Sequence, residues 1–459
     1  MREKFQKSGL VALGAVLGVM LSLNFSAIAD KDTKNQLPLD ELRAFAEVFG
    51  KIKSDYVDPV EDKKLLSEAI SGMLTGLDPH SAYMDADAFK ELQDSTQGAF
   101  GGLGIEVGME DGLVKVVSPI EDTPAFKAGL KSGDLIMKLD DTLVKGLSLN
   151  EAVKKMRGLP DTPIVLTVLR KGELKPLTFT LVRAIIKVQS VKSKLTEPGY
   201  GYIRITQFQE RTVEDLAKAL KTMHDQNNMP YKGFVLDLRN NPGGLLDAAV
   251  GVSAAFLPKN DLVVYTEGRT TDAKRRLLAV PKEYNRESKD PLADLPDDVK
   301  TMPMVVLVNG GSASASEIVS GALQDHGRAV ILGTQTFGKG SVQTILPMNN
   351  GAGIKLTTAR YFTPNGRSIQ AKGIVPDIIV EDPADQGFGL READLSHHLT
   401  NPKEAETAGD KTPINKSVTP EKETQKAERQ VPFEPATKSD YQFTQAMNLL
   451  KGLQILHKK

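Results

Sequence analysis

Apolar residues along the chain recur at two spacings, one typical of helices and one typical of buried strands. Helical spacing, with apolar residues at every third or fourth position, occurs at residues 39–56, 60–77 and 441–456. Short apolar runs, typical of strands buried on both faces, occur at residues 201–206, 233–238, 304–308 and 329–332. A helical stretch at residues 212–223 lies between the first two runs. This alternation predicts a multidomain α/β protein with parallel strand pairing.

The run at residues 304–308 leads into a serine-rich helix start, Ser312–Glu317. A serine at a strand-to-helix turn is exposed at the positive end of the helix dipole, where backbone N–H groups can bind an oxyanion. Such a nucleophile needs a base, and His326 stands one helix away, about 15 Å along the helix axis. Lys339, in a glycine-flanked loop, is the better candidate if burial lowers its pKa from about 10.4 to about 7–8. Gln343 follows closely and could hold the amine through its amide oxygen.

Two motifs in this region, G-S-A-S-A-S-E-I at residues 311–318 and T-F-G-K-G-S-V-Q at residues 336–343, point to a known family. They resemble the motifs of the carboxyl-terminal processing proteases, which are serine peptidases with a Ser–Lys dyad. The resemblance implies that Ser314 is the nucleophile, that Lys339 is the general base and that Gln343 orients the lysine. It runs from about residue 38 to about residue 380 and again over the C-terminal helix. It also implies a crotonase- or ClpP-like core, with a mixed sheet and flanking helices.

The same motifs have two other interpretations. Ser314 and Glu317 match the capping box S-x-x-E, in which the serine is only a helix N-cap. Residues 333–340 nearly match a phosphate-binding loop, but Gly340 stands where a serine or threonine would hold magnesium. The run after Gly340 also alternates like a strand rather than a helix. Both motifs together, in the family's order, favour the protease.

The turn Asn241-Pro-Gly-Gly244 follows the strand at residues 233–238. In the family that the chain resembles, a glycine turn supplies half of the oxyanion hole. The resemblance therefore assigns this role to Gly243 or Gly244, with the N–H of Ala315 as the other half. A plain structural turn is the alternative. Loss of one oxyanion donor typically costs roughly 10²–10³ in rate.

Residues 92–185 resemble a PDZ domain, in which a glycine-rich loop runs into a strand. A glycine-rich tight turn alone would explain the loop equally well, but a second motif at residues 123–136 resembles the PDZ helix and the turn before its central strand. The expected peptide-binding residues are Phe100, Gly101, Gly102, Leu103, Gly104 and Ile105. PDZ domains add an extended peptide to a sheet edge and capture its terminal carboxylate with loop N–H groups. The resemblance thus implies recognition of substrate C-termini.

The composition excludes several classes of function. The 459 residues carry a net charge of −1, so no nucleic-acid partner is implied, and there is no cysteine for disulfides, thiol catalysis or cysteine-bound zinc. We expect no cofactor and no metal. Positive residues, an apolar run and Ala27-Ile-Ala29 are typical of a secretion signal at residues 1–29. We expect cleavage and export to a bacterial periplasm, which leaves no membrane span; an uncleaved anchor is the alternative.

The patterns divide the chain into six segments. They are a signal peptide at 1–29, a helical region at 30–91, a PDZ domain at 92–185, a protease core at 186–390, a flexible linker at 391–438 and an amphipathic helix at 439–459. The two helical ends are expected to form subunit contacts in a homo-oligomer, with cover for the chain's own core as the alternative.

The expected function is therefore cleavage of envelope proteins that are bound by their C-termini, under the control of a peptide or of a lipoprotein adaptor that the resemblance suggests. The alternative is a PDZ-bearing, chaperone-like peptide-binding protein with an inactive hydrolase core.

Overall fold

The computed structural model describes residues 37–456, except residues 121, 188, 228, 287, 382–389 and 403–434. The chain divides into two compact units, residues 1–71 and residues 72–459. The expected signal peptide lies outside the described residues, as does most of the expected linker. Within the described part of the chain, no helix is long and apolar enough to cross a membrane.

The described part of the N-terminal unit, from residue 37 onward, is helical, as the spacing of its apolar residues predicts. α2 spans Leu39–Asp55, and α3 spans Asp62–Thr75 and crosses the boundary between the two units. Neither helix contains a buried residue. The apolar stripe of α2 is therefore exposed, as at Leu42 and Phe45.

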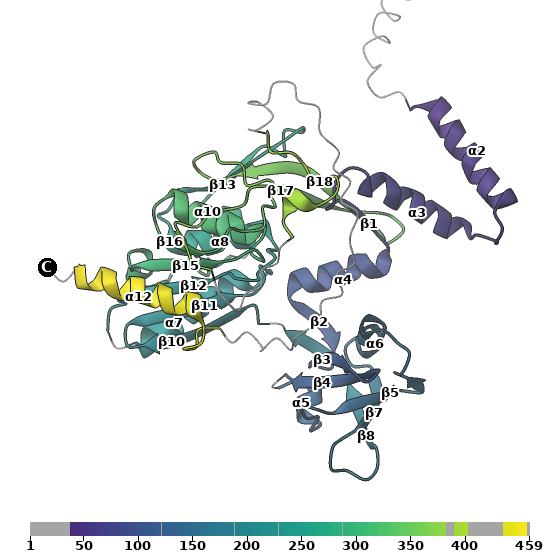
Figure 1. The fold of residues 1–459 in the computed structure, drawn as a ribbon, viewed down its shortest axis with the longest axis horizontal. Helices are drawn as coiled ribbons and strands as arrows, with labels where there is room; N and C mark the ends of the chain where they lie inside the picture. Colours follow the sequence, from purple (N-terminus) through teal and green to yellow (C-terminus); the bar gives the residue numbers. More distant parts are fainter. Residues whose placement is uncertain are drawn as a thin grey trace, which may run out of the picture. The chain divides into compact units, whose positions relative to one another are not determined.

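A six-stranded sheet forms the centre of the large unit, in the order β10-β11-β12-β15-β16-β19 (Figure 1). Its strands are β10 (Val191–Glu197), β11 (Tyr200–Ile205), β12 (Gly233–Asp237), β15 (Met304–Val308), β16 (Val330–Gly333) and β19 (Ile378–Ile379). β10 is antiparallel to β11, and all other neighbours are parallel. The four runs predicted as buried strands correspond to β11, β12, β15 and β16, which confirms the α/β class.

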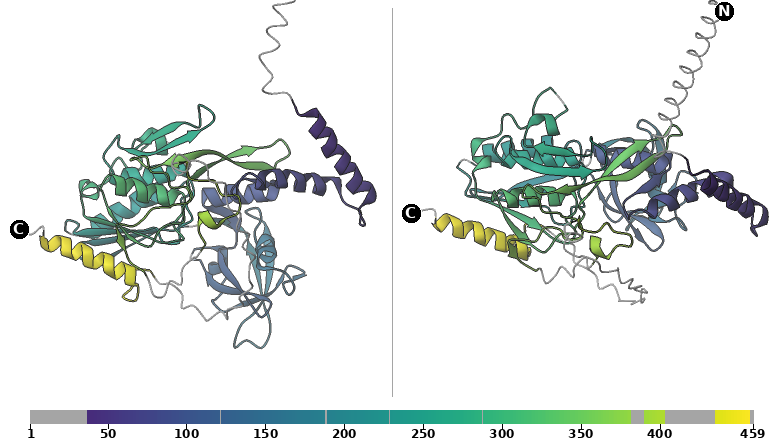
Figure 2. Two further views of the ribbon diagram at one scale, coloured as in Figure 1. Left: turned by 45° about the horizontal axis from the view of Figure 1, so that its top comes forward. Right: turned by 90° about the horizontal axis from the view of Figure 1, so that it is seen from above.

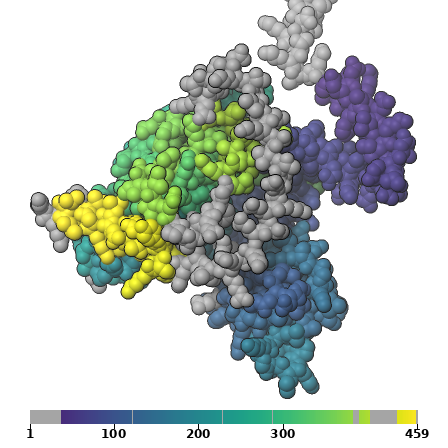
Figure 3. Space-filling model, viewed as in Figure 1, coloured from purple at the N-terminus to yellow at the C-terminus, as the bar shows by residue number. Residues whose placement is uncertain are grey.

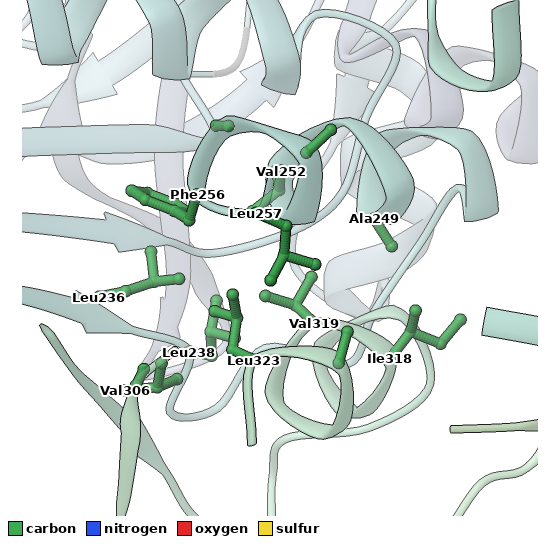
Figure 4. Close-up of a cluster of buried hydrophobic side chains, with 14 of the residues drawn as sticks. Leu236, Leu238, Ala249, Val252, Phe256, Leu257, Val306, Ile318, Val319 and Leu323 are labelled. Carbon is green, nitrogen blue, oxygen red and sulfur yellow. The ribbon is translucent and has the colours of Figure 1, made fainter. Parts of the chain in front are cut away.

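Helices cover both faces of this sheet. Three of them lie on one face: α7 (Thr212–Gln226), α8 (Leu246–Phe256) and α10 (Ala315–Asp325). Successive residues of a strand point to opposite faces. Leu236 and Val306 therefore pack with α8 and α10 (Figure 4), while Val235 and Val305 point the other way. Burial on both faces is the reason that these strands are unbroken apolar runs.

The C-terminal helix α12 (Tyr441–Leu456) covers the opposite face and lies beside the core strands in both views of Figure 2. Its residues Phe443 and Leu450 are buried in one apolar cluster with Tyr202 and Val305. Figure 3 shows the outer side of the helix at the surface of the core. The structure thus differs from the expected subunit contact, because this stripe docks on the chain's own core.

Residues 391–402, expected as the start of a flexible linker, also differ from expectation. They include a short 3-10 helix, η2 (Glu392–Asp394), and Glu392 is fully buried. Its carboxylate is paired with His80 and Gln370 inside the core. Composition could not reveal these partners, which make the burial of a charged residue tolerable.

A second sheet, antiparallel throughout, has five strands. They are β1 (Ala82–Met84), β13 (Leu262–Gly268), β14 (Arg275–Leu278), β17 (Ser341–Pro347) and β18 (Gly353–Phe362). β18 pairs with β1, β13 and β17. The β17–β18 pair places Gln343 opposite Thr357, so the end of the lysine motif belongs to this sheet.

Residues 103–182 form a β domain with a core of its own. Its strands are β3 (Ile105–Glu110), β4 (Leu113–Pro119), β5 (Leu135–Leu139), β6 (Thr142–Leu143), β7 (Pro163–Leu169) and β8 (Leu177–Val182), with the helices α5 (Pro124–Lys127) and α6 (Leu149–Met156). β2 (Ala99–Gly102) pairs instead with β9 (Ala184–Lys187). The first half of the expected peptide-binding loop is therefore a strand.

Three further helices occur in the described part of the large unit. They are α4 (Ala86–Gln97), α9 (Pro281–Tyr284) and the 3-10 helix η1 (Asp297–Lys300).

Candidate active site

Ser314 stands at the junction of β15 and α10 with an unusual backbone. Its φ is 54° and its ψ is −113°, and residues with a Cβ rarely adopt such a positive φ. Such a backbone costs about 1–3 kcal/mol and persists only where its surroundings enforce it. Here the N–H of Ala313 and the hydroxyl of Ser316 both donate to the carbonyl of Asn241, at 3.0 and 2.9 Å. The serine turn is thereby tied to the Asn241–Gly244 turn.

Glu317 joins the serine turn to the lysine loop. It is fully buried, and its carboxylate accepts four hydrogen bonds, from the hydroxyl of Thr336 (2.6 Å) and the N–H groups of Ser314 (2.8 Å), Gly338 (2.7 Å) and Lys339 (2.9 Å). Burial raises the pKa of Glu317 to about 7, against the hydrogen bonds that lower it. All four partners are donors, which suits the ionised form.

The role of Glu317 was only partly visible in the sequence. The capping-box pattern predicts its contact with the N–H of Ser314, which the structure contains. The pattern gives no sign that the same carboxylate also binds two N–H groups of the lysine loop.

The lysine loop packs closely through its glycines, as expected. A Cβ added at Gly340 would lie 2.4 Å from the backbone nitrogen of Gln370, and Gly338 has a φ of 101°. The N–H of Gly340 donates to the side-chain oxygen of Gln370 at 3.0 Å. No larger residue could bring the backbone this close.

The half-buried amine of Lys339 has a lowered pKa, as a general base requires. Burial is the main cause and the positive charge of Lys355 is the second; together they lower the pKa to about 8. The carboxylates of Glu392, Glu317 and Asp78 oppose this shift, because they favour the charged amine.

A cavity of about 600 Å³ brings the expected catalytic residues together. Its lining includes Ser314, Lys339 and Gln343, together with Gly244 and Ala315. Apolar side chains form much of the remaining wall: Phe208, Leu245, Leu277, Ile318 and Val342. His326 follows the far end of α10, about 16 Å along the helix, where Nε2 is 2.8 Å from the carbonyl of Leu262.

The two glycines expected at the oxyanion hole differ in whether their N–H group is available. The N–H of Gly243 already donates to Oδ1 of Asn241 at 2.9 Å, and Gly243 does not line the cavity. A Cβ added there would lie 2.8 Å from the Cβ of Ser314. Within the described residues, the N–H groups of Gly244 and Ala315 donate no hydrogen bond inside the chain. Gly243 therefore allows close contact, and Gly244 has the available donor.

Tyr361 on β18 is a site residue that the sequence did not single out. It is buried and lines the cavity. Its hydroxyl donates to the carbonyl of Lys339 and also contacts the side chain of Ser314. A tyrosine carries no signal in the sequence for such a position, because only the packing of β18 beside the lysine loop creates it.

The six residues expected to bind peptide lie away from this cavity. None of them lines it. Leu103 is buried in the core of its own domain. Gly104 has a φ of 76°, and a Cβ added to it would lie only 2.2 Å from the Cβ of Thr123, so no larger residue fits there. The carbonyls of Leu103 and Gly104 accept from Ala125 (3.0 Å) and Ile120 (2.9 Å), so internal hydrogen bonds hold the turn.

Comparisons with known families agree with this division of the chain. The family described as Peptidase family S41 matches residues 199–380, and the PDZ domain family matches residues 101–181. The Activating protease CtpB N-terminal domain matches residues 14–88. The fold and these matches define a serine-type peptidase that carries a PDZ domain.

Similar proteins with known names identify the family more narrowly. A carboxy-terminal-processing protease of Bartonella bacilliformis is 46% identical over 447 residues, which are 95% of this chain and 95% of that protein. The carboxy-terminal processing protease CtpB of Bacillus subtilis is 37% identical over 361 residues, 78% of this chain and 71% of that protein. A solved photosystem II D1 C-terminal processing protease is 30% identical, covers 73% of this chain and 86% of its own, and has a TM-score of 0.41. The chain belongs to the carboxy-terminal processing protease family.

Proposed function

We propose that the protein is an exported endopeptidase that cleaves polypeptides with a Ser314–Lys339 dyad. One observation carries this proposal: Ser314 and Lys339 line the same cavity, and the pKa of Lys339 is lowered to about 8. An ordinary lysine, with a pKa of about 10.4, is almost entirely charged at neutral pH. This lysine is neutral in about one molecule in ten at pH 7, which is enough for a base.

In the proposed mechanism, neutral Lys339 takes the proton from the hydroxyl of Ser314, whose oxygen attacks the scissile carbonyl. The leaving amine receives its proton from the Lys339 ammonium, and an acyl-enzyme remains. Lys339 then deprotonates a water that releases the product. Gln343 orients the lysine; its Nε2 donates to Ser341 (2.9 Å) and Thr357 (3.3 Å), which leaves Oε1 to accept from the amine.

We assign the oxyanion hole to the N–H groups of Gly244 and Ala315. Both residues line the cavity, and Ala315 is the first residue of α10, where N–H groups lack helical partners. The positive end of the helix dipole adds to the stabilisation of a developing negative charge. Gly243 contributes space rather than a donor, because its N–H is already used.

The PDZ domain is proposed to bind the C-terminus of the substrate through residues 100–105. The domain's match supports this role, as do the glycines that shape the turn. Bound peptide or an adaptor would then control cleavage. A peptide ending in apolar residues should compete with substrate for the PDZ domain at a fixed protease concentration, and a Gly104→Val variant should lose that competition.

Export, substrates and assembly complete the proposal. The signal-like residues 1–29 support a periplasmic location, where envelope proteins would be substrates. The exposed stripe of α2 supports a homo-oligomer, so Leu42→Glu and Phe45→Glu should lower the mass measured by analytical ultracentrifugation. A lipoprotein adaptor should be captured at stoichiometric level by Ser314→Ala; its absence would count against an adaptor.

The proposal is tested with an unstructured protein such as casein. Wild-type protein should cleave it, whereas Ser314→Ala and Lys339→Ala should not, and His326→Ala should match wild type. Near-normal turnover by Lys339→Ala would refute the dyad. Peptide binding without cleavage by any folded form would favour the alternative, a peptide-binding protein with an inactive core.

A further inference from the structure

Two polar residues are buried in the turn Asp78–Ser81, between α3 and β1. Asp78 and Ser81 are only 3% and 2% exposed. Oδ1 of Asp78 accepts from the N–H groups of His80 and Ser81, both at 2.9 Å, and Oδ2 accepts from the Ser81 hydroxyl at 2.6 Å. Burial alone would raise the pKa of Asp78, but these hydrogen bonds outweigh it and the pKa is lowered. The turn therefore carries a fixed negative charge.

Two series of hydrogen bonds, called arms below, lead from this turn to the proposed catalytic residues, and the first reaches Gln343. The hydroxyl of Thr357 donates to Oδ1 of Asp78 at 3.0 Å and accepts from Nε2 of Gln343 at 3.3 Å. The N–H of Thr357 donates to the Ser81 hydroxyl at 3.1 Å. Because Asp78 holds the hydroxyl proton of Thr357, the lone pairs of that oxygen face the amide of Gln343. The turn thus fixes which end of the amide points away from Thr357.

The other arm reaches the lysine loop itself. Nε2 of His80 lies 2.7 Å from Oε2 of the buried Glu392, whose Oε1 accepts from Gln370 at 2.8 Å. Gln370 in turn accepts the N–H of Gly340, and the N–H of Glu392 donates to the carbonyl of Phe337 at 3.2 Å. These contacts hold the backbone on both sides of Lys339.

We propose that the Asp78–Ser81 turn is a positioning element for the general base: through Thr357 it orients Gln343, and through Glu392 and Gln370 it holds the lysine loop. The inference rests on the proposed Ser314–Lys339 dyad. None of these residues needs to touch substrate, so they act through Lys339 and Gln343. The contacts span more than 270 positions of sequence between Ser81 and Thr357, which makes the site dependent on a segment outside the S41 match.

Thr357→Val tests the first arm, because valine keeps the shape and removes the hydroxyl. We expect kcat to fall by about 10- to 100-fold, as small displacements of catalytic groups do, with KM little changed. Thr357→Ser should restore most of the activity. Thr358→Val is the matched control: its hydroxyl pairs with Thr344 at an exposed site, 2.7 Å away, on the neighbouring position of the strand.

Asp78→Asn tests the charge while it keeps an acceptor oxygen. The charged or titratable groups around Lys339 are Lys355 and Tyr361 on β18, Glu317 on α10, Glu392 in η2 and Asp78 itself. Loss of the Asp78 charge should shift the acid limb of the pH–rate profile to lower pH, since that carboxylate favours the ammonium form. Loss of positioning would in addition lower kcat on the plateau of the profile, whereas an effect of charge alone would move the limb and leave the plateau unchanged.

Different results would refute the proposed dyad and the positioning role of the turn. If Lys339→Ala is active, the dyad is wrong. If Lys339→Ala is inactive but Thr357→Val, or Asp78→Asn on the plateau of its profile, has wild-type kcat, the positioning role is refuted. Circular dichroism checks the fold of each variant; should Thr357→Val not fold, Asp78→Asn decides the question alone.

Discussion

Replacing Lys355 with methionine removes a positive charge from the cavity that contains Lys339, the proposed general base. Lys355 and Lys339 both line this cavity, and the charge of Lys355 is the second cause, after burial, of the low pKa of Lys339. Among the described residues, Lys355 has no ion pair that would neutralise it. Without it, the ammonium form of Lys339 is less disfavoured, so the pKa of Lys339 must rise.

The size of the effect follows from the fraction of neutral lysine. With a pKa of about 8, that fraction is about 0.1 at pH 7 and about 0.9 at pH 9, so the wild-type rate should rise about tenfold and then level off. An unperturbed lysine would give a rise of about a hundredfold over the same interval, without a plateau. In Lys355→Met the acid limb should move to higher pH, which lowers the rate at pH 7 far more than at pH 9.5.

The assay is kcat/KM for an internally quenched peptide from pH 6 to pH 10, because this parameter reports ionisations of the free enzyme. Lys355→Arg keeps the charge and should keep the wild-type profile, and Ser314→Ala gives the background. Circular dichroism at each pH confirms the fold. A wild-type midpoint near pH 10 would refute the lowered pKa, and an equal loss at every pH in Lys355→Met would refute the role of its charge.

Three further substitutions, and one control, test the site and its supports. Gly243→Ala should reduce cleavage by about 100-fold, because the new Cβ would lie 2.8 Å from the Cβ of Ser314 and displace that side chain; a fully active variant would contradict the packing. Lys339→Met should raise the melting temperature at pH 7, because it removes a charge that burial disfavours. The gain should shrink as pH rises from about 8 to about 10.4, since in that range the amine is largely neutral in the folded wild-type chain but still protonated in the unfolded one. A gain independent of pH would contradict the burial of a charge. Asp440→Ala removes two hydrogen bonds, at 2.8 and 2.6 Å, from the buried Arg239 and should lower the free energy of unfolding by about 3–5 kcal/mol in a urea titration, whereas Lys451→Ala, which breaks an exposed pair, should cost about 0–1 kcal/mol.

The elements of the fold were predictable because their signals are local. Apolar runs and helical spacing are properties of neighbouring residues, and they correctly predicted β11, β12, β15 and β16 as well as α2 and α7. The glycine, serine and lysine motifs were equally visible, so the family and its enzyme class followed from the sequence. The docking of α12 was not predictable, since an apolar stripe shows that a helix is covered but not by what.

What the sequence by itself determined is therefore the set of elements, the family and the candidate residues Ser314, Lys339 and Gln343. Only the tertiary structure decided that Gly244 rather than Gly243 has an available N–H, because that depends on the side chain of Asn241. It also decided the surroundings of the Lys339 amine, on which residues far apart in the chain, such as Asp78 and Glu392, act. The spacing of apolar residues is a property of nearby positions and can be recognised in the sequence. A pKa depends instead on every charge within a few ångströms, whichever segment supplies it.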